Sequence, residues 1–112
     1  MKSKSQFLKG CIRTSVLQLL SEKPMYGYQI ATELAKRSED IFSLGQGTLY
    51  PMLYSLEKKN LIKTSHTEFL DNGRKRLYYT ITESGFEMLE ENKLTWFEVV
   101  RAMQLVLGTN YG

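Results

Sequence analysis

Two runs of residues with β-type composition, 61–70 and 75–82, flank a tetrapeptide at 71–74 that contains Asn72-Gly73. Asn-Gly is a strong signal for a tight hairpin, because both central positions of such a turn require a positive φ. The sequence therefore predicts a two-stranded hairpin with Asn72 and Gly73 in its turn. This feature restricts the fold more than any other part of the chain. Only folds in which the first 60 residues are followed by a two-stranded hairpin are compatible with it.

Apolar residues at helical spacing predict three helices before the hairpin. The predicted ranges are 6–21, 26–37 and 47–59. In the third helix, residues 49, 52, 53 and 56 form an inward apolar stripe. Pro51 lies near the start of this helix, where a missing amide has no intrahelical partner. Asn60 is suited to the left-handed conformation that ends a helix.

A short apolar run at 41–44 predicts a small strand between the second and third helices. The whole order of elements is then helix, helix, short strand, helix and hairpin. This is the order of a winged helix-turn-helix domain. The fold class expected is thus mixed α+β, mainly α.

A fourth helix is predicted from about residue 83 to residue 107, with Thr82 or Ser84 as its N-cap. Its apolar residues alternate in steps of three and four, as at the seam of a coiled coil. The seam consists of Phe86, Leu89, Lys93, Trp96, Val100, Met103 and Leu107. A helix of about 37 Å is too long to be covered by so small a core. We therefore expect a DNA-binding domain at 1–82 and a dimerisation helix at 83–112.

Composition and charge exclude several classes of protein. The chain has 112 residues with one cysteine and one histidine, so no internal disulfide is possible, and a tetrahedral zinc site would need carboxylates or a second chain. A cytoplasmic location is expected. No apolar run is long enough to span a membrane. No nucleophile, base or nucleotide-binding loop has the required spacing, so we expect no enzyme activity, no catalytic residues and no cofactor.

The charge is unevenly distributed along the chain. Residues 1–80 hold 13 of the 15 basic residues and 7 of the 12 acidic residues, a net charge of +6. The third helix presents hydroxyls, amides and a lysine opposite its apolar stripe, and the hairpin turn carries three consecutive cations. We predict that these two segments contact DNA. The predicted DNA-binding residues are Gln46, Thr48, Tyr50, Pro51, Tyr54, Lys58, Arg74, Lys75 and Arg76. The alternative is packing for the tyrosines and a solvated turn for the cations.

Trp96 lies in the middle of the seam, and two roles are open to it. It packs in the subunit interface, or it forms a platform for a flat hydrophobic ligand held between subunits. The predicted effector-binding residues are Phe7, Cys11, Trp96 and Val100. His66 is expected to be an ordinary surface residue of the first hairpin strand.

Five segments carry a resemblance to a known family. They are Met25-Tyr26-Gly27-Tyr28-Gln29-Ile30, Gly47-Thr48-Leu49-Tyr50-Pro51-Met52-Leu53 with Leu56-Glu57, Leu61-Ile62, Gly73-Arg74-Lys75-Arg76-Leu77-Tyr78-Tyr79, and Ile81-Thr82-Glu83-Ser84-Gly85. In order and spacing, over residues 8 to 90, they resemble the PadR family of bacterial transcriptional regulators. The resemblance implies a winged helix-turn-helix, a dimer formed by the last helix and repression of a nearby operon. A single C-terminal helix is similar to the smaller members of the family.

The resemblance also bears on the effector site. Trp96 falls where a multidrug-responsive small member has a tryptophan that stacks on planar compounds. Two positions differ from the family pattern: Asn60 stands where glycine is usual, and Val100 replaces an acidic residue, which disfavours a cationic drug.

Together these features predict a homodimeric, sequence-specific DNA-binding repressor that recognises a palindromic operator. A planar hydrophobic or phenolic effector, bound at the dimer interface, would release it from the DNA. The alternatives are a DNA-binding regulator with no small-molecule effector and a winged-helix module that binds another protein.

Overall fold

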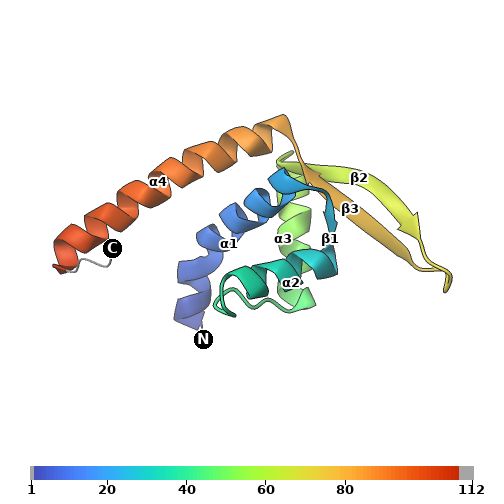
Figure 1. Cartoon of the computed structure of the whole chain (residues 1–112), viewed down its shortest axis with the longest axis horizontal. Helices are drawn as coiled ribbons and strands as arrows, with labels where there is room; N and C mark the ends of the chain where they lie inside the picture. The colour runs from blue at the N-terminus through green and yellow to red at the C-terminus, as the bar shows by residue number, and fades with distance from the viewer. Residues whose placement is uncertain (1, 109–112) are drawn as a thin grey trace.

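The fold is seen in a computed structural model that describes residues 2–108, with side chains from residue 8 onward. Within this range it consists of four helices and one three-stranded antiparallel sheet with strand order β1-β3-β2. The elements are α1 Lys2–Glu22, β1 Met25–Tyr26, α2 Gly27–Arg37, α3 Gln46–Lys58, β2 Ile62–Phe69, β3 Lys75–Ile81 and α4 Glu83–Leu107. The predicted winged helix-turn-helix with a long C-terminal helix is confirmed. Figure 1 shows that α4 begins at the base of the β2–β3 hairpin and that the two run in opposite directions from there.

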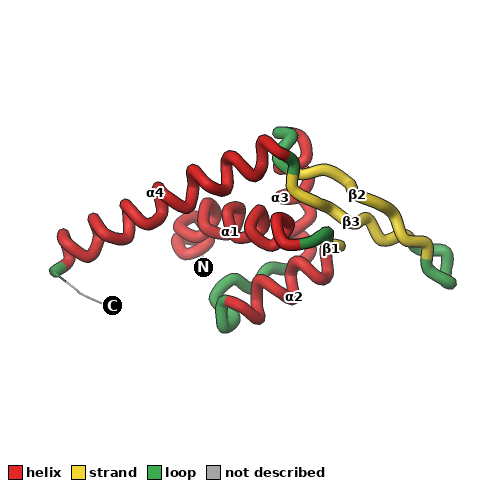
Figure 2. Tube along the Cα trace, turned by 45° about the horizontal axis from the view of Figure 1, so that its top comes forward, coloured by secondary structure: helices red, strands yellow, loops and turns green. Residues whose placement is uncertain are grey.

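The core lies between α1, α2, α3 and the base of the sheet (Figure 2). All four residues of the predicted stripe in α3 are buried, and α1 contributes five more buried residues. The buried apolar side chains are Ile12, Val16, Leu17, Leu19, Leu20, Met25, Ile30, Leu34, Leu49, Met52, Leu53, Leu56, Ile62, Tyr79 and Leu89. Leu89 is the only one of these that comes from α4, so most of that helix lies outside the core.

Local signals fix where the helices begin and end. The Gln29 side chain accepts a hydrogen bond from the Tyr26 amide at the start of α2 (3.1 Å). Asn60 has φ 62° just after α3, as predicted for a left-handed cap. Thr82, rather than Ser84, is the N-cap of α4, since its hydroxyl accepts a hydrogen bond from the Gly85 amide (3.0 Å). A side chain at Gly85 would overlap the carbonyl of Leu61, so glycine allows α4 to start this close to the sheet.

The prediction of a strand at 41–44 is wrong. Glu39 and Asp40 both have positive φ, at 52° and 67°, and they turn the chain sharply after α2. The Ser38 hydroxyl then accepts a hydrogen bond from the Phe42 amide (2.9 Å), which holds the segment as a loop. The third strand is β1, where Met25 pairs with Tyr79. A strand of two residues gives too little periodicity to be recognised from sequence.

The hairpin forms where it was predicted, but with a different turn. Of the two residues expected at positive φ, only Gly73 has it, at 82°. The Gly73 amide donates to the Leu70 carbonyl (3.0 Å), and the Leu70 amide donates to the Arg74 carbonyl (2.9 Å). This is a three-residue loop with glycine at its left-handed position. Asp71 is thus part of the turn, and the cations that follow Gly73 lie at the tip of the hairpin.

Pro51 lies farther along α3 than predicted. The helix α3 begins at Gln46, after its N-cap Gly45, so Pro51 is its sixth residue and lies beyond the first turn. Its missing amide leaves the carbonyl of Gly47 without the usual donor four residues later. Both Gly47 and Pro51 are exposed. The proline therefore removes one backbone hydrogen bond from an exposed part of α3.

Candidate nucleic-acid interface

The outer side of α3 is accessible along its whole length. The six residues predicted to contact DNA from this helix are all exposed: Gln46, Thr48, Tyr50, Pro51, Tyr54 and Lys58. Five of them lie outside the buried stripe that anchors the helix, and Gln46 is the first residue of the helix, so the fold holds the helix by one side and presents the other. Hydroxyl, amide and ammonium groups on such a side can donate to phosphates and to base edges.

The two tyrosines of α3 have different surroundings. The ring of Tyr50 lies against the start of α2, because a Cβ atom added to Gly27 would come within 2.6 Å of its hydroxyl oxygen. Burial raises the pKa of Tyr79, and the nearby Glu57 and Tyr50 raise it further. Tyr54 is 65% exposed, and the Lys58 Nζ atom lies 6.0 Å from the centre of its ring. Tyr54 and Lys58 are therefore accessible to a ligand, whereas one side of the Tyr50 ring packs against the start of α2.

The tip of the hairpin carries two exposed cations, Arg74 and Lys75. The Asn72 side chain accepts a hydrogen bond from the Arg74 amide (3.0 Å), which fixes the backbone but leaves the guanidinium unpaired in the described part of the chain. Lys75 Nζ lies 5.8 Å from the centre of the Phe69 ring, which is itself exposed. The tip thus presents positive charge on a stiff turn, as a contact with the DNA backbone requires.

Arg76 differs from its two neighbours. Its Nη1 atom is 3.1 Å from Glu68 Oε1, and its guanidinium carbon is 4.5 Å from the centre of the Tyr26 ring. The hydrogen bond to Glu68 raises the pKa of Arg76. The side chain is half-buried on the face of the sheet that is turned away from α3. The structure therefore groups Arg76 with the sheet rather than with Arg74 and Lys75, and its contact with DNA stays a prediction.

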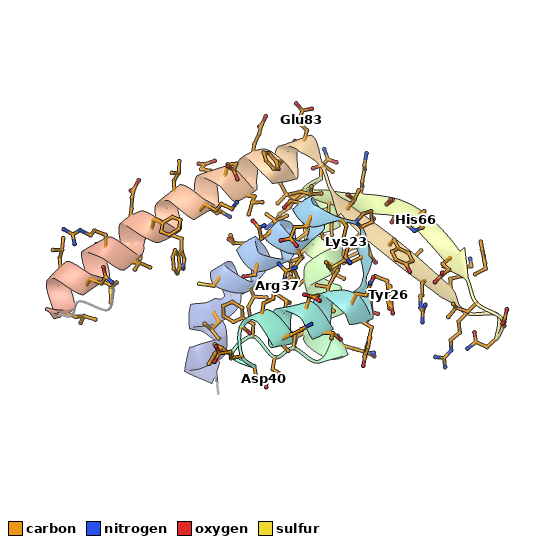
Figure 3. The ribbon with its side chains drawn as sticks, viewed as in Figure 1. Lys23, Tyr26, Arg37, Asp40, His66 and Glu83 are labelled. Atoms are coloured by element: carbon orange, nitrogen blue, oxygen red, sulfur yellow. The ribbon has the colours of Figure 1, made fainter. Side chains whose placement is uncertain are left out.

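Sequence reasoning missed an aromatic cluster on that same face of the sheet. The rings of His66 and Tyr78 are stacked with centres 4.3 Å apart, and Tyr26 meets Tyr78 edge-on at 5.3 Å. Figure 3 shows Tyr26 at the start of α2 and His66 on β2. A bulge between Thr64 and His66 shifts the register and brings His66 opposite Tyr78. Alternation of side chains along the strands cannot reveal a pair that depends on a bulge.

Two of the predicted effector residues lie together. Cys11 of α1 and Trp96 of α4 line one groove of about 480 Å³ between α1, α2 and α4. Phe97 meets the Trp96 ring edge-on, with centres 5.1 Å apart. Val100 is half-buried one turn beyond Trp96 and does not line this groove. The side chain of Phe7 lies outside the described residues.

The charged groups at the rim of this groove are already paired. Arg37 binds Glu22 at 2.7 Å and Glu33 at 3.0 Å, and the Arg37 hydrogen bond lowers the pKa of Glu22 from its usual value of 4.5 to about 2. Lys93 lines the groove and pairs with Glu90 at 3.2 Å. The groove therefore offers apolar and aromatic surface with little unbalanced charge, which suits an uncharged planar ligand.

The sequence matches the model of the "Transcriptional regulator PadR-like family" over residues 16–91. The chain belongs to this family. The matched segment runs from α1 through the hairpin to the first third of α4, so it contains both α3 and the cationic tip. The family consists of transcriptional regulators rather than enzymes, and membership implies that this PadR-like protein binds DNA.

Individual relatives agree with this assignment. An uncharacterized protein of Lysinibacillus sphaericus is 35% identical over 93% of this chain and 94% of its own length. A transcriptional regulator of Mycobacterium tuberculosis is 28% identical over 86% and 85% of the two chains. The crystal structure of a PadR-like transcriptional regulator from Bacillus cereus superposes with a TM-score of 0.78 and 34% identity, covering 95% of this chain and all of the other.

Two further observations bear on other kinds of site in this PadR-like regulator. Among the side chains that the structure describes, no three His, Cys, Asp or Glu residues come together as metal ligands. No helix within residues 2–108 has the length and apolar character needed to cross a membrane.

Proposed function

We propose that this PadR-like regulator acts as a homodimer that binds a palindromic operator and represses transcription in the cytoplasm. Residues 1–82 form its DNA-binding domain and residues 83–112 its dimerisation helix. The observation that carries the proposal is the exposure of α4, because its second half has apolar side chains but almost nothing of its own chain to cover them.

The first half of α4 is held by α1. Leu89 is buried, and the Asn92 amide donates to the Thr14 hydroxyl (3.2 Å). The second half extends away from the body (Figure 1). Seven apolar residues there are 47–81% exposed: Trp96, Phe97, Val99, Met103, Leu105, Val106 and Leu107. Five of these, Trp96, Val99, Met103, Val106 and Leu107, lie within about 100° of one another around the helix. A contiguous apolar surface of this kind marks an association site, and a symmetric pair of identical helices is the commonest way to cover one.

In such a dimer each α3 enters a major groove, and each hairpin tip lies along the flanking backbone or minor groove. The two recognition helices would be spaced by about one turn of the duplex, roughly 34 Å. The most accessible DNA-binding candidates are Tyr54 and Lys58 in α3 and Arg74 and Lys75 at the hairpin tip.

The groove beside Trp96 is the candidate effector site. Its volume lies in the range of small-molecule sites, and it touches both α4 and α2. A planar aromatic compound bound there would shift the population between two spacings of the DNA-binding domains. Regulation without any small molecule is the alternative. Trp96 is the only tryptophan, so planar aromatic compounds are titrated into the wild-type protein, and unchanged fluorescence would contradict the effector hypothesis.

The main test is a mobility-shift assay with the DNA upstream of the protein's own gene, combined with light scattering for mass. We expect a discrete shifted complex and a particle of two chains. A monomer at micromolar concentration would refute the dimer. Failure to prefer any genomic fragment over random DNA would favour the alternative in which the winged domain binds another protein.

A further inference from the structure

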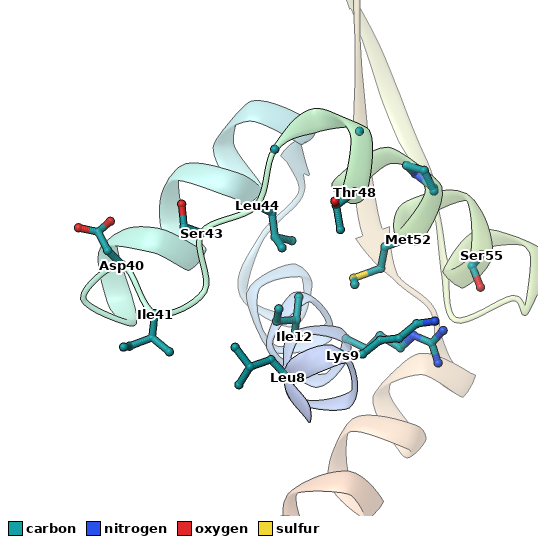
Figure 4. Close-up of a pocket in the computed structure, with 14 residues that line it drawn as sticks. Leu8, Lys9, Ile12, Asp40, Ile41, Ser43, Leu44, Thr48, Met52 and Ser55 are labelled. Atoms are coloured by element: carbon teal, nitrogen blue, oxygen red, sulfur yellow. The ribbon is translucent and has the colours of Figure 1, made fainter. Parts of the chain in front are cut away.

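A second groove runs between α1 and α3, on the side of α3 that faces away from the sheet. Its volume is about 820 Å³, and it is lined from α1 by Leu8, Lys9, Ile12 and Arg13 and from α3 by Gly47, Thr48, Pro51, Met52 and Ser55. Figure 4 shows the Lys9 side chain reaching from α1 toward the side of Ser55. The groove therefore joins two cations of α1 to the exposed flank of the recognition helix.

Neither cation is neutralised by the described part of the chain. The ion pairs there involve other residues, and Lys9 is exposed. The Nε atom of Arg13 is shielded from solvent and has no hydrogen-bond partner. The one carboxylate that lines the groove, Asp40, lies at the end opposite Lys9 (Figure 4). Two like charges one helical turn apart repel each other unless an anion lies between them or beside them.

The α3 helix has two flanks with different neighbours. On one flank Tyr50 lies against α2, and Glu57 accepts a hydrogen bond from Thr64 of β2 (3.3 Å). This flank belongs to the sheet and leads to the hairpin tip. On the other flank the hydroxyls of Thr48 and Ser55 line the groove that holds the α1 cations. The hydroxyls on this second flank therefore lie beside cations of α1 rather than beside residues of the sheet.

We infer that Lys9 and Arg13 bind backbone phosphates of the DNA strand that borders α3 on the side opposite the hairpin. A helix in the major groove lies between two sugar-phosphate strands about 12 Å apart, so both of its flanks meet phosphates. The tip of the hairpin serves one strand, and the α1 cations with the Ser55 and Thr48 hydroxyls serve the other. The inference rests on the proposed placement of α3 in the major groove.

Besides its two cations the groove has apolar lining residues, which could also pack against protein. The competing occupant is therefore an acidic segment of a second copy of the chain. Phosphates are favoured because the two cations stand beside hydroxyl groups of the recognition helix itself, where a strand of DNA must pass. Contacts with phosphates carry no sequence information and appear in the salt dependence of affinity. This property separates them from contacts between protein subunits.

The test measures the affinity of Lys9→Gln, Arg13→Gln and the double variant for a random-sequence duplex of about 30 base pairs, between 50 and 200 mM salt. Each lost phosphate contact lowers the slope of log K against log salt by about 0.9 for each bound protomer. As the salt concentration rises fourfold, the affinity of the wild type should therefore fall by a factor about 3.5 times larger than the affinity of each single variant, for each bound protomer. Arg13→Lys keeps the charge and should keep the slope.

Lys63→Gln is the matched control, because Lys63 is exposed and lies on the face of the sheet turned away from α3. It should leave the slope unchanged. If Lys9→Gln and Arg13→Gln leave the slope unchanged while Arg74→Ala lowers it, the inference is wrong and the proposed function stands. A rise in the dimer dissociation constant at an unchanged slope would also overturn it, in favour of a subunit contact. A wild-type protein without salt-dependent DNA binding would overturn both.

Discussion

Replacement of Val106 by Ala tests whether a second chain covers the far half of α4. Val106 is 81% exposed, so the folded single chain loses almost no buried surface with this change. Alanine also has the higher helix propensity, and the free energy of unfolding of the isolated chain should change by no more than about 0.5 kcal/mol. A change in the dissociation constant of the dimer can then be attributed to the interface rather than to unfolding of the chain.

The expected effect on association follows from the carbon atoms removed. Valine to alanine removes two carbons, each contributing about 0.8 kcal/mol when fully buried. A twofold axis places the substitution in the interface twice, which gives about 3 kcal/mol in all. This corresponds to a rise of about 100-fold in the dissociation constant of the dimer.

Sedimentation equilibrium on a dilution series measures this constant, and circular dichroism verifies the helical content. Arg101→Ala is the matched control, because Arg101 is exposed on the same helix but lies about 140° around it from Val106. The control should associate like the wild type. A dissociation constant for Val106→Ala within threefold of wild type would show that the far half of α4 is not the interface.

Three further outcomes are expected. Leu53→Ala removes a core side chain that is 1% exposed and should lower the free energy of unfolding in urea by 2–5 kcal/mol. The pKa of Glu22 is lowered to about 2, so its pair with Arg37 contributes fully above pH 4.5 and is lost as the pH falls toward 2. Because both side chains are partly exposed, Glu22→Gln should reduce this acid dependence by less than about 1 kcal/mol, measured by thermal unfolding across that range. Arg74→Ala should weaken binding equally for operator and random DNA and lower the salt slope by about one unit per bound protomer, whereas an unchanged slope would mean that the tip does not touch DNA.

Periodic and local signals predicted most of the fold. The stripe in α3, the left-handed Asn60 and the extent of α4 depend on residues close together in the sequence, and all three are confirmed. The failures depend on long-range pairing. Met25 joins the sheet only because Tyr79 lies beside it, and no feature of residues 25 and 26 by themselves indicates a strand.

The candidate site was predicted as a set of residue types rather than as a geometry. Arg74, Lys75 and Arg76 are equivalent in the sequence, yet Arg76 pairs with Glu68 because strand alternation turns it to the opposite face. Tyr50 and Tyr54 are similarly distinguished only by Gly27, which comes from another helix. Lys9 and Arg13 were not singled out at all, since only the packing of α1 on α3 places them beside the recognition helix.

The short strand β1 has a mechanical consequence. Tyr26 ends this strand, meets the Tyr78 ring edge-on and, through its backbone amide, donates a hydrogen bond to the Gln29 side chain at the start of α2. Tyr26 thus links the hairpin to the start of α2, and the shared core joins α3 to the base of the same hairpin. If an effector beside Trp96 changes the spacing of the two DNA-binding domains, as proposed, each α3 would then move together with its own hairpin.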